Sequence, residues 1–359
     1  MRLTRRHVLA GLMAGAVTRP TMAKPTGLRL AAEWEPHKGC VMALNDAADT
    51  YGSRTTRRIQ EEQAAIANAI AMFEPVTMLI NPAQRNRAEK ILKASITLVE
   101  MAHYDVWTRD TMPTIADGPA NTSIAVDWNF NVWGEKYPGY DRDRDLAARF
   151  AASNGLERRT APIVCEGGAI EVDGQGTLIT TETCLLNPNR NPGKSRTEVE
   201  EGLRQMTGAR HIVWLKGSEA DTVTDGHIDA LMRIIRPGVV VVEITDDPLD
   251  PEYGDLLENL VRMRKARDIN GQPFEVHVVK RPDWDIMPRR GDDFSSSYVN
   301  SYFPNGGIIM PRFNDAKADA AARALFQALE PDRKIVQIDT SEICEGGGGI
   351  HCNTMQIPA

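Results

Sequence analysis

The sequence lacks several patterns that would assign it quickly to a class of protein. It has no Cys-x-x-Cys pair, which counts against a zinc ribbon or a thioredoxin-like protein. Its formal net charge is −7 and no basic patch stands out beyond the N-terminus, which counts against a nucleic-acid partner. The 359 residues contain no low-complexity linker, and their 42% hydrophobic and 25% charged content is typical of a globular protein.

The N-terminal segment has the pattern of an export signal. Arg5-Arg6 is a twin arginine, residues 8–17 form a short apolar region, and Thr21-Met22-Ala23 offers small residues at a cleavage site. The apolar region is too short to span a membrane, and the twin arginine resembles a bacterial Tat signal. We expect residues 1–23 to be removed and residues 24–359 to form a single catalytic domain. The processed protein would be periplasmic or secreted, without a membrane partner. The alternative is a basic cytoplasmic N-terminus.

Cysteine is scarce and odd in number, with five residues in total: Cys40, Cys165, Cys184, Cys344 and Cys352. An odd number predicts at least one unpaired thiol. Cys352 follows four consecutive glycines, residues 346–349, and glycine backbone can approach a ligand closely. This pattern favours a nucleophile, whereas the alternative is a small buried core residue after a flexible turn.

Strand and helix patterns alternate along the rest of the chain. Apolar or β-rich runs predict strands, and helical periodicity follows most of them. The predicted strands are 40–44, 76–80, 123–126, 177–181, 211–215, 239–244, 274–279, 307–311 and 334–338, and the predicted helices are 57–73, 143–152, 196–206, 252–265 and 316–329. About five strand-rich units, each with one helix, suggest a pseudo-symmetric radial array, although an ordinary α/β sandwich fits the pattern equally well.

Two stretches place carboxylates at turns. Trp107–Pro113 sets Asp110 between an arginine and a proline, which by itself fits a surface ion pair. Cys165–Ile170 sets Glu166 before a glycine pair, which fits either a cleared space in front of a charge or a plain hairpin turn.

Two further stretches suggest a site. Thr224–Asp229 contains His227 and Asp229, which would point to one face of an extended strand. An imidazole beside a carboxylate is an acid/base device, a pair of metal ligands, or a structural histidine. Residues 127–141 form an aromatic loop rich in glycine and proline, which would cover a pocket or pack on itself.

Taken together, these stretches resemble the agmatine deiminase family of the guanidino-group-modifying (pentein) superfamily. The matching stretches cover nearly the whole chain after the leader, and they are residues 33–37, 127–141, 166–192, 225–233 and 346–352. The resemblance implies an α/β fold, a five-fold pseudo-symmetric ββαβ propeller, and a hydrolase that needs no cofactor and no metal. It implies a small cationic guanidino substrate, and the sequence does not decide between a monomer and a homodimer.

The resemblance also implies roles for individual residues. Cys352 would attack the guanidinium carbon, His227 would serve as acid and base, and Glu166 would orient that histidine. Asp110 and Asp229 would hold the guanidinium nitrogens by charge-assisted hydrogen bonds. These assignments predict a covalent thiouronide intermediate on the way from agmatine to N-carbamoylputrescine and ammonia.

Trp107 would stack on the substrate cation. Arg109 is a candidate partner for the α-carboxylate of arginine, although Asp110 would compete for it.

Several positions depart from the family pattern, namely Met112, Gly349 and Leu44-Asn45. They leave open a deiminase of free arginine or of peptidyl-arginine, and a non-catalytic periplasmic protein that binds cationic amines. A metal site built from Glu166, His227, Asp229 and Cys352 is a further alternative.

Overall fold

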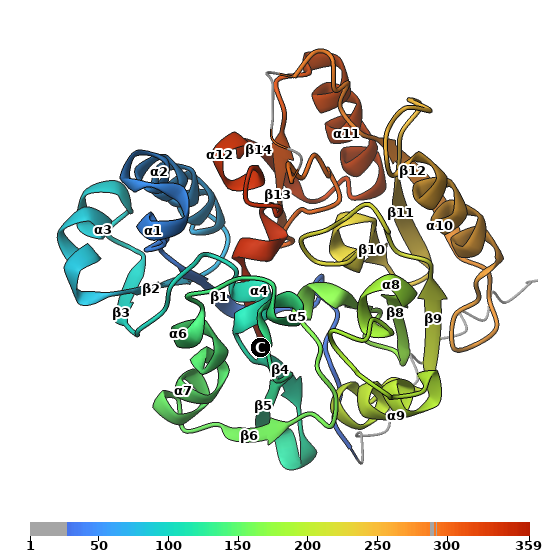
Figure 1. Cartoon of the computed structure of the whole chain (residues 1–359), viewed down its shortest axis with the longest axis horizontal. Coiled ribbons are helices and arrows are strands. Elements are labelled where there is room, and N and C mark those ends of the chain that lie inside the picture. Colours follow the sequence, from blue (N-terminus) through green and yellow to red (C-terminus); the bar gives the residue numbers. More distant parts are fainter. Residues whose placement is uncertain (1–26, 288–290, 292) are drawn as a thin grey trace, which may run out of the picture.

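The computed structural model describes residues 27–287, 291 and 293–359 (Figure 1). The expected leader, residues 1–23, lies outside the described residues. Among the described residues, no helix is long and apolar enough to cross a bilayer.

Five small sheets lie around a common centre, with the long helices on the outside of the ring (Figure 1). Three sheets share one plan: an inner strand pairs antiparallel with a second strand, and a helix then leads to a third strand parallel to the second. These units are β4 (Thr114–Asp117), β5 (Ser123–Asp127), α7 (Leu146–Ser153) and β6 (Glu157–Thr160); β7 (Ile170–Val172), β8 (Thr177–Thr181), α9 (Arg196–Thr207) and β9 (His211–Leu215); and β10 (Met232–Arg236), β11 (Val239–Ile244), α10 (Tyr253–Lys265) and β12 (Glu275–Lys280).

The remaining two units vary this plan. In the fifth unit, β13 (Gly307–Arg312), α11 (Ala316–Leu329) and β14 (Lys334–Asp339) form the outer part, and Tyr302 bridges Ile309 antiparallel in place of a full inner strand. In the first unit, β1 (His37–Ala43) is joined through α2 (Ser53–Ile70) to the parallel strand β2 (Val76–Ile80), and β3 (Thr97–Glu100) extends the sheet. Its inner strand is β15 (Met355–Pro358), which pairs antiparallel with β1 and closes the ring. The five ββαβ units therefore agree with the propeller that the resemblance implied.

The regular elements form where the sequence pattern is strong. Strands β2, β8, β9 and β11 and helix α11 have the predicted bounds. Helix α9 begins at a capping box between Ser195 and Glu198 and ends at Gly208 in the left-handed conformation, and α11 begins at the Asp315 cap.

Short helical turns precede the inner strands and meet at the centre of the ring. They are α4 (Thr108–Thr111) before β4, η3 (Gly167–Ala169) before β7, η4 (Ile228–Ala230) before β10 and η5 (His351–Asn353) before β15. Turn α4 packs against η3 and η5, and η3 packs against η4. Other short elements are α1 (Ala48–Tyr51), η1 (Pro82–Gln84), α3 (Arg85–Ile91), η2 (Pro119–Asn121), α5 (Val132–Glu135), α6 (Asp141–Arg144), α8 (Glu182–Leu185) and α12 (Ser341–Cys344).

Residues 224–229 do not form the extended segment in which His227 and Asp229 would share one face. The carboxylate of Asp221 accepts hydrogen bonds from the backbone N–H groups of Thr224 and Gly226, and this closes a compact turn. Gly226 has φ +90°, and the chain then enters η4 directly after His227. His227 and Asp229 therefore approach each other through a turn, not along one face of a strand.

Candidate active site

The central turns bring together the side chains that the sequence singled out. Asp110 lies on α4, Glu166 immediately precedes η3, and His227 and Asp229 flank the start of η4, and all four side chains are buried. A Cβ atom added to Gly168 would lie 2.6 Å from His227 Nδ1, 2.9 Å from Asp110 Oδ1 and 3.1 Å from Asp229 Oδ2. Three polar groups from two units, Asp110 from the second and His227 and Asp229 from the fourth, therefore face one point that only glycine leaves open.

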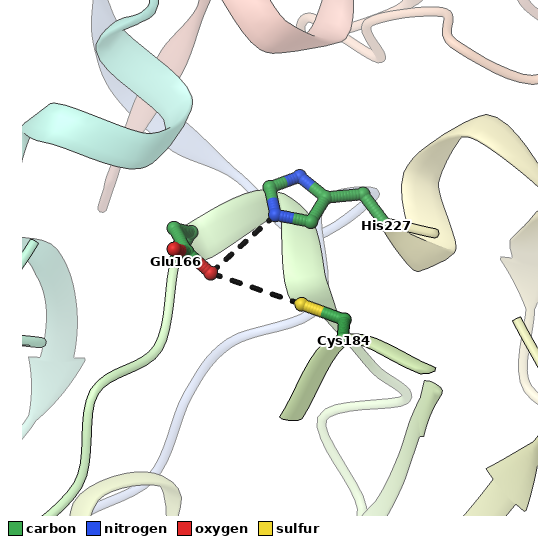
Figure 2. A group of neighbouring side chains, drawn as sticks. All are labelled: Glu166, Cys184 and His227. Atoms are coloured by element: carbon green, nitrogen blue, oxygen red, sulfur yellow. Dashed lines mark hydrogen bonds and ion pairs between the residues drawn. The ribbon is translucent and has the colours of Figure 1, made fainter. Parts of the chain in front are cut away.

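His227 and Glu166 form a buried pair (Figure 2). His227 Nε2 lies 3.4 Å from Glu166 Oε2, and Arg190 Nε donates to Glu166 Oε1 at 2.6 Å. Burial alone would raise the pKa of Glu166, but Arg190 and His227 lower it to about 2. Burial opposes a charged imidazole at His227, yet the nearby carboxylates of Asp110 and Glu166 raise its pKa well above the usual value. The raised pKa favours the imidazolium form of His227 beside the ionised carboxylate of Glu166.

Asp110 is held from two directions. Trp133 Nε1–H donates to its Oδ2 at 2.9 Å, and the backbone N–H of Gly168 donates to its Oδ1 at 3.0 Å. Burial raises the pKa of Asp110, and His227, whose Nδ1 lies 3.8 Å away, opposes that shift. The carboxylate is thus fixed in orientation before any ligand arrives.

Asp229 has one oxygen engaged and one without a partner. Its Oδ2 lies 2.6 Å from His351 Nδ1, whose Nε2 lies 2.9 Å from Glu33 Oε2. Its Oδ1 is buried and makes no hydrogen bond to any described residue. Burial raises the pKa of Asp229, but hydrogen bonding and charge from His351 outweigh it and lower that pKa. A buried, ionised oxygen of this kind is suited to accept a hydrogen bond from a cation.

Cys352 faces Asp229 and Asn300. Its Sγ lies 3.7 Å from Asp229 Oδ2 and accepts a hydrogen bond from Asn300 Nδ2 at 3.2 Å. Burial and the carboxylates of Asp229 and Asp110 raise the pKa of the thiol well above its usual value, although Asn300 opposes the shift. The thiol is therefore protonated at neutral pH in the free protein, and a bound cation between the carboxylates would favour the thiolate.

A cavity of about 150 Å³ opens beside Cys352. Its described lining is aromatic and acidic, and consists of Thr50, Tyr51, Trp107, Asp110, Trp133, Tyr137, Tyr140, Val223, Thr224, Asp293, Glu345, Gly346, Gly347, Gly348 and Cys352. The aromatic loop, residues 127–141, supplies three of these rings. It also packs on itself, since Trp133 makes an edge-on contact with Tyr140 at 5.4 Å between centroids.

Trp107 lies along the cavity with its indole N–H donated to Asp105. The glycines before Cys352 make room for it, because a Cβ atom on Gly346 or Gly348 would collide with the ring. A Cβ atom on Gly349 would lie 2.6 Å from Asn300 Oδ1. The glycine run therefore admits Trp107 and Asn300 beside the thiol, as well as clearing the approach to it.

Known proteins share this fold and match nearly the whole length of this chain. The family model described as Porphyromonas-type peptidyl-arginine deiminase matches residues 29–358. The chain belongs to this family. The agmatine deiminase of Pseudomonas aeruginosa strain LESB58 is 38% identical over 94% of this chain and 99% of its own length. A solved structure of the agmatine deiminase of Enterococcus faecalis has a TM-score of 0.86 and 31% identity, covering 92% of this chain and 96% of that one. An agmatine deiminase from C. jejuni, at 21% identity and a TM-score of 0.79, shares the fold.

Within this peptidyl-arginine deiminase fold, the structure adds residues that the sequence analysis gave no role. Arg190 holds Glu166, Trp133 holds Asp110, His351 holds Asp229, and Asn300 contacts the thiol. Arg190 and Trp133 lie in stretches that carried the resemblance, so their position was a signal. Asn300 had none in the sequence, but it precedes the Tyr302 bridge of the fifth unit, as the other central residues precede inner strands.

The alternative metal site of Glu166, His227, Asp229 and Cys352 differs from the cluster of possible ligands in the structure. In the described part of the chain, the group of three ligand atoms within 4.8 Å of one another is Glu166, Cys184 and His227, without Asp229 or Cys352.

Proposed function

We propose that this protein hydrolyses agmatine to N-carbamoylputrescine and ammonia through a covalent intermediate on Cys352. The support is of two kinds, namely membership of a deiminase family together with 38% identity to an agmatine deiminase, and a buried site suited to a planar cation. A guanidinium group needs hydrogen-bond acceptors on its edges, a ring against its face and a nucleophile above its carbon.

The two aspartates would hold the guanidinium edges. Asp229 Oδ1, which has no hydrogen-bond partner among the described residues, would accept from one nitrogen, and the fixed carboxylate of Asp110 would accept from another. Trp107 would pack on the substrate next to Cys352. The arriving cation would lower the pKa of the thiol, so the thiolate would form mainly when substrate is bound.

The chemistry then needs one acid that becomes a base. Attack by the thiolate forms the S–C bond, His227 gives its proton to the departing nitrogen, and the C–N bond breaks to release ammonia. The neutral imidazole next takes one proton from water, whose oxygen adds to the same carbon. The S–C bond then breaks with its electron pair going to sulfur, and the remaining hydroxyl proton leaves as the ureido C=O forms, which restores the Cys352 thiol. Glu166, ionised beside Arg190, would stabilise the imidazolium in both half-reactions.

The observation that favours agmatine over arginine is the charge of the cavity. Its described lining contains the carboxylates of Asp110, Asp293 and Glu345 and no basic side chain. Arg109, the suggested partner for an α-carboxylate, is buried and already bound to other side chains. Its Nη2 lies 3.1 Å from Glu33 Oε2, and its Nη1 donates to Gln356 Oε1 at 2.7 Å. The expectation that Asp110 would compete for Arg109 was wrong, since the ion pair of Arg109 is with Glu33.

An acidic cavity suits the ammonium end of agmatine. The α-carboxylate of arginine would enter that cavity without a cationic partner among the described lining residues, at a cost of several kcal/mol. We therefore expect kcat/KM for agmatine to exceed that for free arginine by at least ~10²-fold, a size of discrimination that an unpaired polar group can supply.

The test is a panel assay for ureido product with agmatine, arginine and a peptidyl-arginine. Comparable efficiency on arginine or on the peptide would transfer the assignment to an exported arginine or peptidyl-arginine deiminase. Binding of agmatine without turnover would instead favour a cationic-amine binding protein.

A further inference from the structure

Cys184 is a buried thiol that the proposed reaction does not use. It lies on α8 and reaches Glu166, with its Sγ 3.9 Å from Glu166 Oε2 (Figure 2). The same Oε2 atom lies 3.4 Å from His227 Nε2. One thiol, one carboxylate oxygen and one imidazole nitrogen therefore surround a single point, and each belongs to a fully buried side chain or, for His227, a nearly fully buried one.

The spacing of these atoms approaches that of a zinc site. Zn²⁺ binds sulfur at about 2.3 Å and nitrogen or oxygen at about 2.0–2.2 Å, so neighbouring ligand atoms in a tetrahedral site lie about 3.3–3.6 Å apart. The two measured edges are 3.4 and 3.9 Å, and all three atoms lie within 4.8 Å of one another. The three ligand atoms would move closer together around a bound ion.

Two further observations fit a ligand at this point. The His227 ring is only 2% exposed, and neither ring nitrogen makes a hydrogen bond to a described residue, although Nε2 forms an ion pair with Glu166 Oε2 at 3.4 Å. Arg190 bonds Glu166 through Oε1, which leaves Oε2 directed at His227 and Cys184. The positive charge of Arg190 also opposes a second cation, so the site suits reversible binding more than permanent occupancy.

We propose that Glu166, Cys184 and His227 form an inhibitory site for Zn²⁺ or a similar soft divalent cation. Binding forms bonds from the metal to Cys184 Sγ, His227 Nε2 and Glu166 Oε2, and it releases to solvent the thiol proton and any proton on Nε2, with no change of oxidation state. A metal on Nε2 removes the acid/base group, so turnover stops while the guanidinium-binding aspartates stay in place. The inhibitory effect rests on the proposed function, whereas the binding does not.

The first test compares inhibition in matched variants. Wild type, Cys184→Ala and Cys184→Ser are assayed with agmatine over a range of Zn²⁺ concentrations, with Cys40→Ala as a control in another buried thiol. We expect Cys184→Ala and Cys184→Ser to keep turnover and to need at least ~10-fold more Zn²⁺ for half-inhibition, since even supporting residues of metal sites change affinity by 10–100-fold. Cys40→Ala should match wild type, and a chelator should restore activity. Equal Zn²⁺ sensitivity in wild type and in the Cys184 variants would overturn the proposal.

The second test measures binding without activity. Calorimetric titration of Zn²⁺ into Cys352→Ala should show one site, and Cys184→Ala/Cys352→Ala should lose it. If Cys352→Ala fails to bind Zn²⁺, the metal sits on the proposed nucleophile and the site assigned here is wrong. Because this measurement needs no turnover, it separates failure of the metal site from failure of the agmatine deiminase proposal.

Discussion

The side-chain amide of Asn300 hydrogen-bonds to the Cys352 thiol and to the backbone of the preceding residue, His351. Its Nδ2 donates to Cys352 Sγ at 3.2 Å, and its Oδ1 accepts from the backbone N–H of His351 at 2.9 Å. The same amide thus fixes the turn that carries the thiol and offers a hydrogen bond to the sulfur, 52 residues away in sequence. Gly349 is required next to it, because a Cβ atom there would lie 2.6 Å from Asn300 Oδ1.

Replacing Asn300 should therefore slow the reaction. Asn300→Ala is expected to lower kcat/KM by about 10- to 100-fold, because a hydrogen bond to a charged group contributes about 1.5–3 kcal/mol. Asn300→Asp should be worse, since it places a third carboxylate beside the developing thiolate. Steady-state kinetics with agmatine give the measurement, and circular dichroism checks the fold. Wild-type kinetics in Asn300→Asp would contradict this role.

Cys352→Ala should abolish turnover and leave the fold intact. Cys40, Cys165, Cys184 and Cys344 are buried in cores or at the edge of the site, and each should tolerate serine far better. A trapped thiouronide at Cys352, seen by mass spectrometry of acid-quenched enzyme, would identify the nucleophile directly. If another cysteine variant lost activity while Cys352→Ala kept it, the assignment would be wrong.

The raised pKa of Cys352 also predicts a pH dependence. A thiol with a raised pKa carries less thiolate at a given pH, so alkylation of the free enzyme by neutral iodoacetamide should be slow at pH 7. The inactivation rate should keep rising with pH through the usual thiol pKa of about 9, with no plateau below it. A plateau near pH 7 would mean that the free enzyme already holds a thiolate.

Variants of the His227–Glu166 pair should affect the chemical step and leave substrate binding in place. His227→Ala is expected to lower kcat by at least ~10²-fold, since general acid–base catalysis supplies about 10²–10⁴-fold and this residue is proposed to act twice. Glu166→Gln should lower kcat and leave substrate binding in place, because the carboxylate contacts His227 and not the cavity. His277→Ala, which changes a partly exposed imidazole on β12, is the control. Near wild-type turnover in His227→Ala would move the acid/base role elsewhere.

Export is a separate proposal that rests on the leader. We propose that residues 1–23 direct the folded protein through the Tat route. A fusion of residues 1–30 to a folded reporter should reach the periplasm, and replacing Arg5-Arg6 by Lys-Lys should keep it inside. Cytoplasmic retention of the unchanged fusion in a Tat-competent host would contradict the proposal.

The sequence predicted the outer parts of the units better than their inner parts. Strand β11 is a run of four valines, which are buried, and α11 carries regular helical spacing after an Asp315 cap, so local pattern determines both. The turns α4, η3, η4 and η5 are three or four residues long and show no periodicity. Residues 224–229 form a turn and not an extended segment, because Asp221 accepts hydrogen bonds from backbone N–H groups there, which the alternation of side chains does not reveal.

Site residues that lie in a sequence motif could be predicted. Residues that orient them from distant parts of the sequence could not. Cys352, His227, Glu166, Asp110 and Asp229 were named in advance, and the structure brings them together. The groups that orient them are distant in sequence: Arg190 reaches Glu166 over 24 residues within one unit, and His351 reaches Asp229 over 122 residues from another unit. Such contacts depend on ring closure, which no local pattern specifies.

The ring makes the chemistry a property of the whole chain. The first unit supplies Cys352, the second Asp110, the third Glu166, the fourth His227 and Asp229, and the fifth Asn300. No unit holds both the proposed acid/base group and the proposed nucleophile, so a fragment or a partly opened ring would lack an assembled site. A bound guanidinium would contact residues of several units at once, and ligand binding would therefore stabilise the complete ring against unfolding. Loss of activity on heating would then report the opening of whichever unit is weakest.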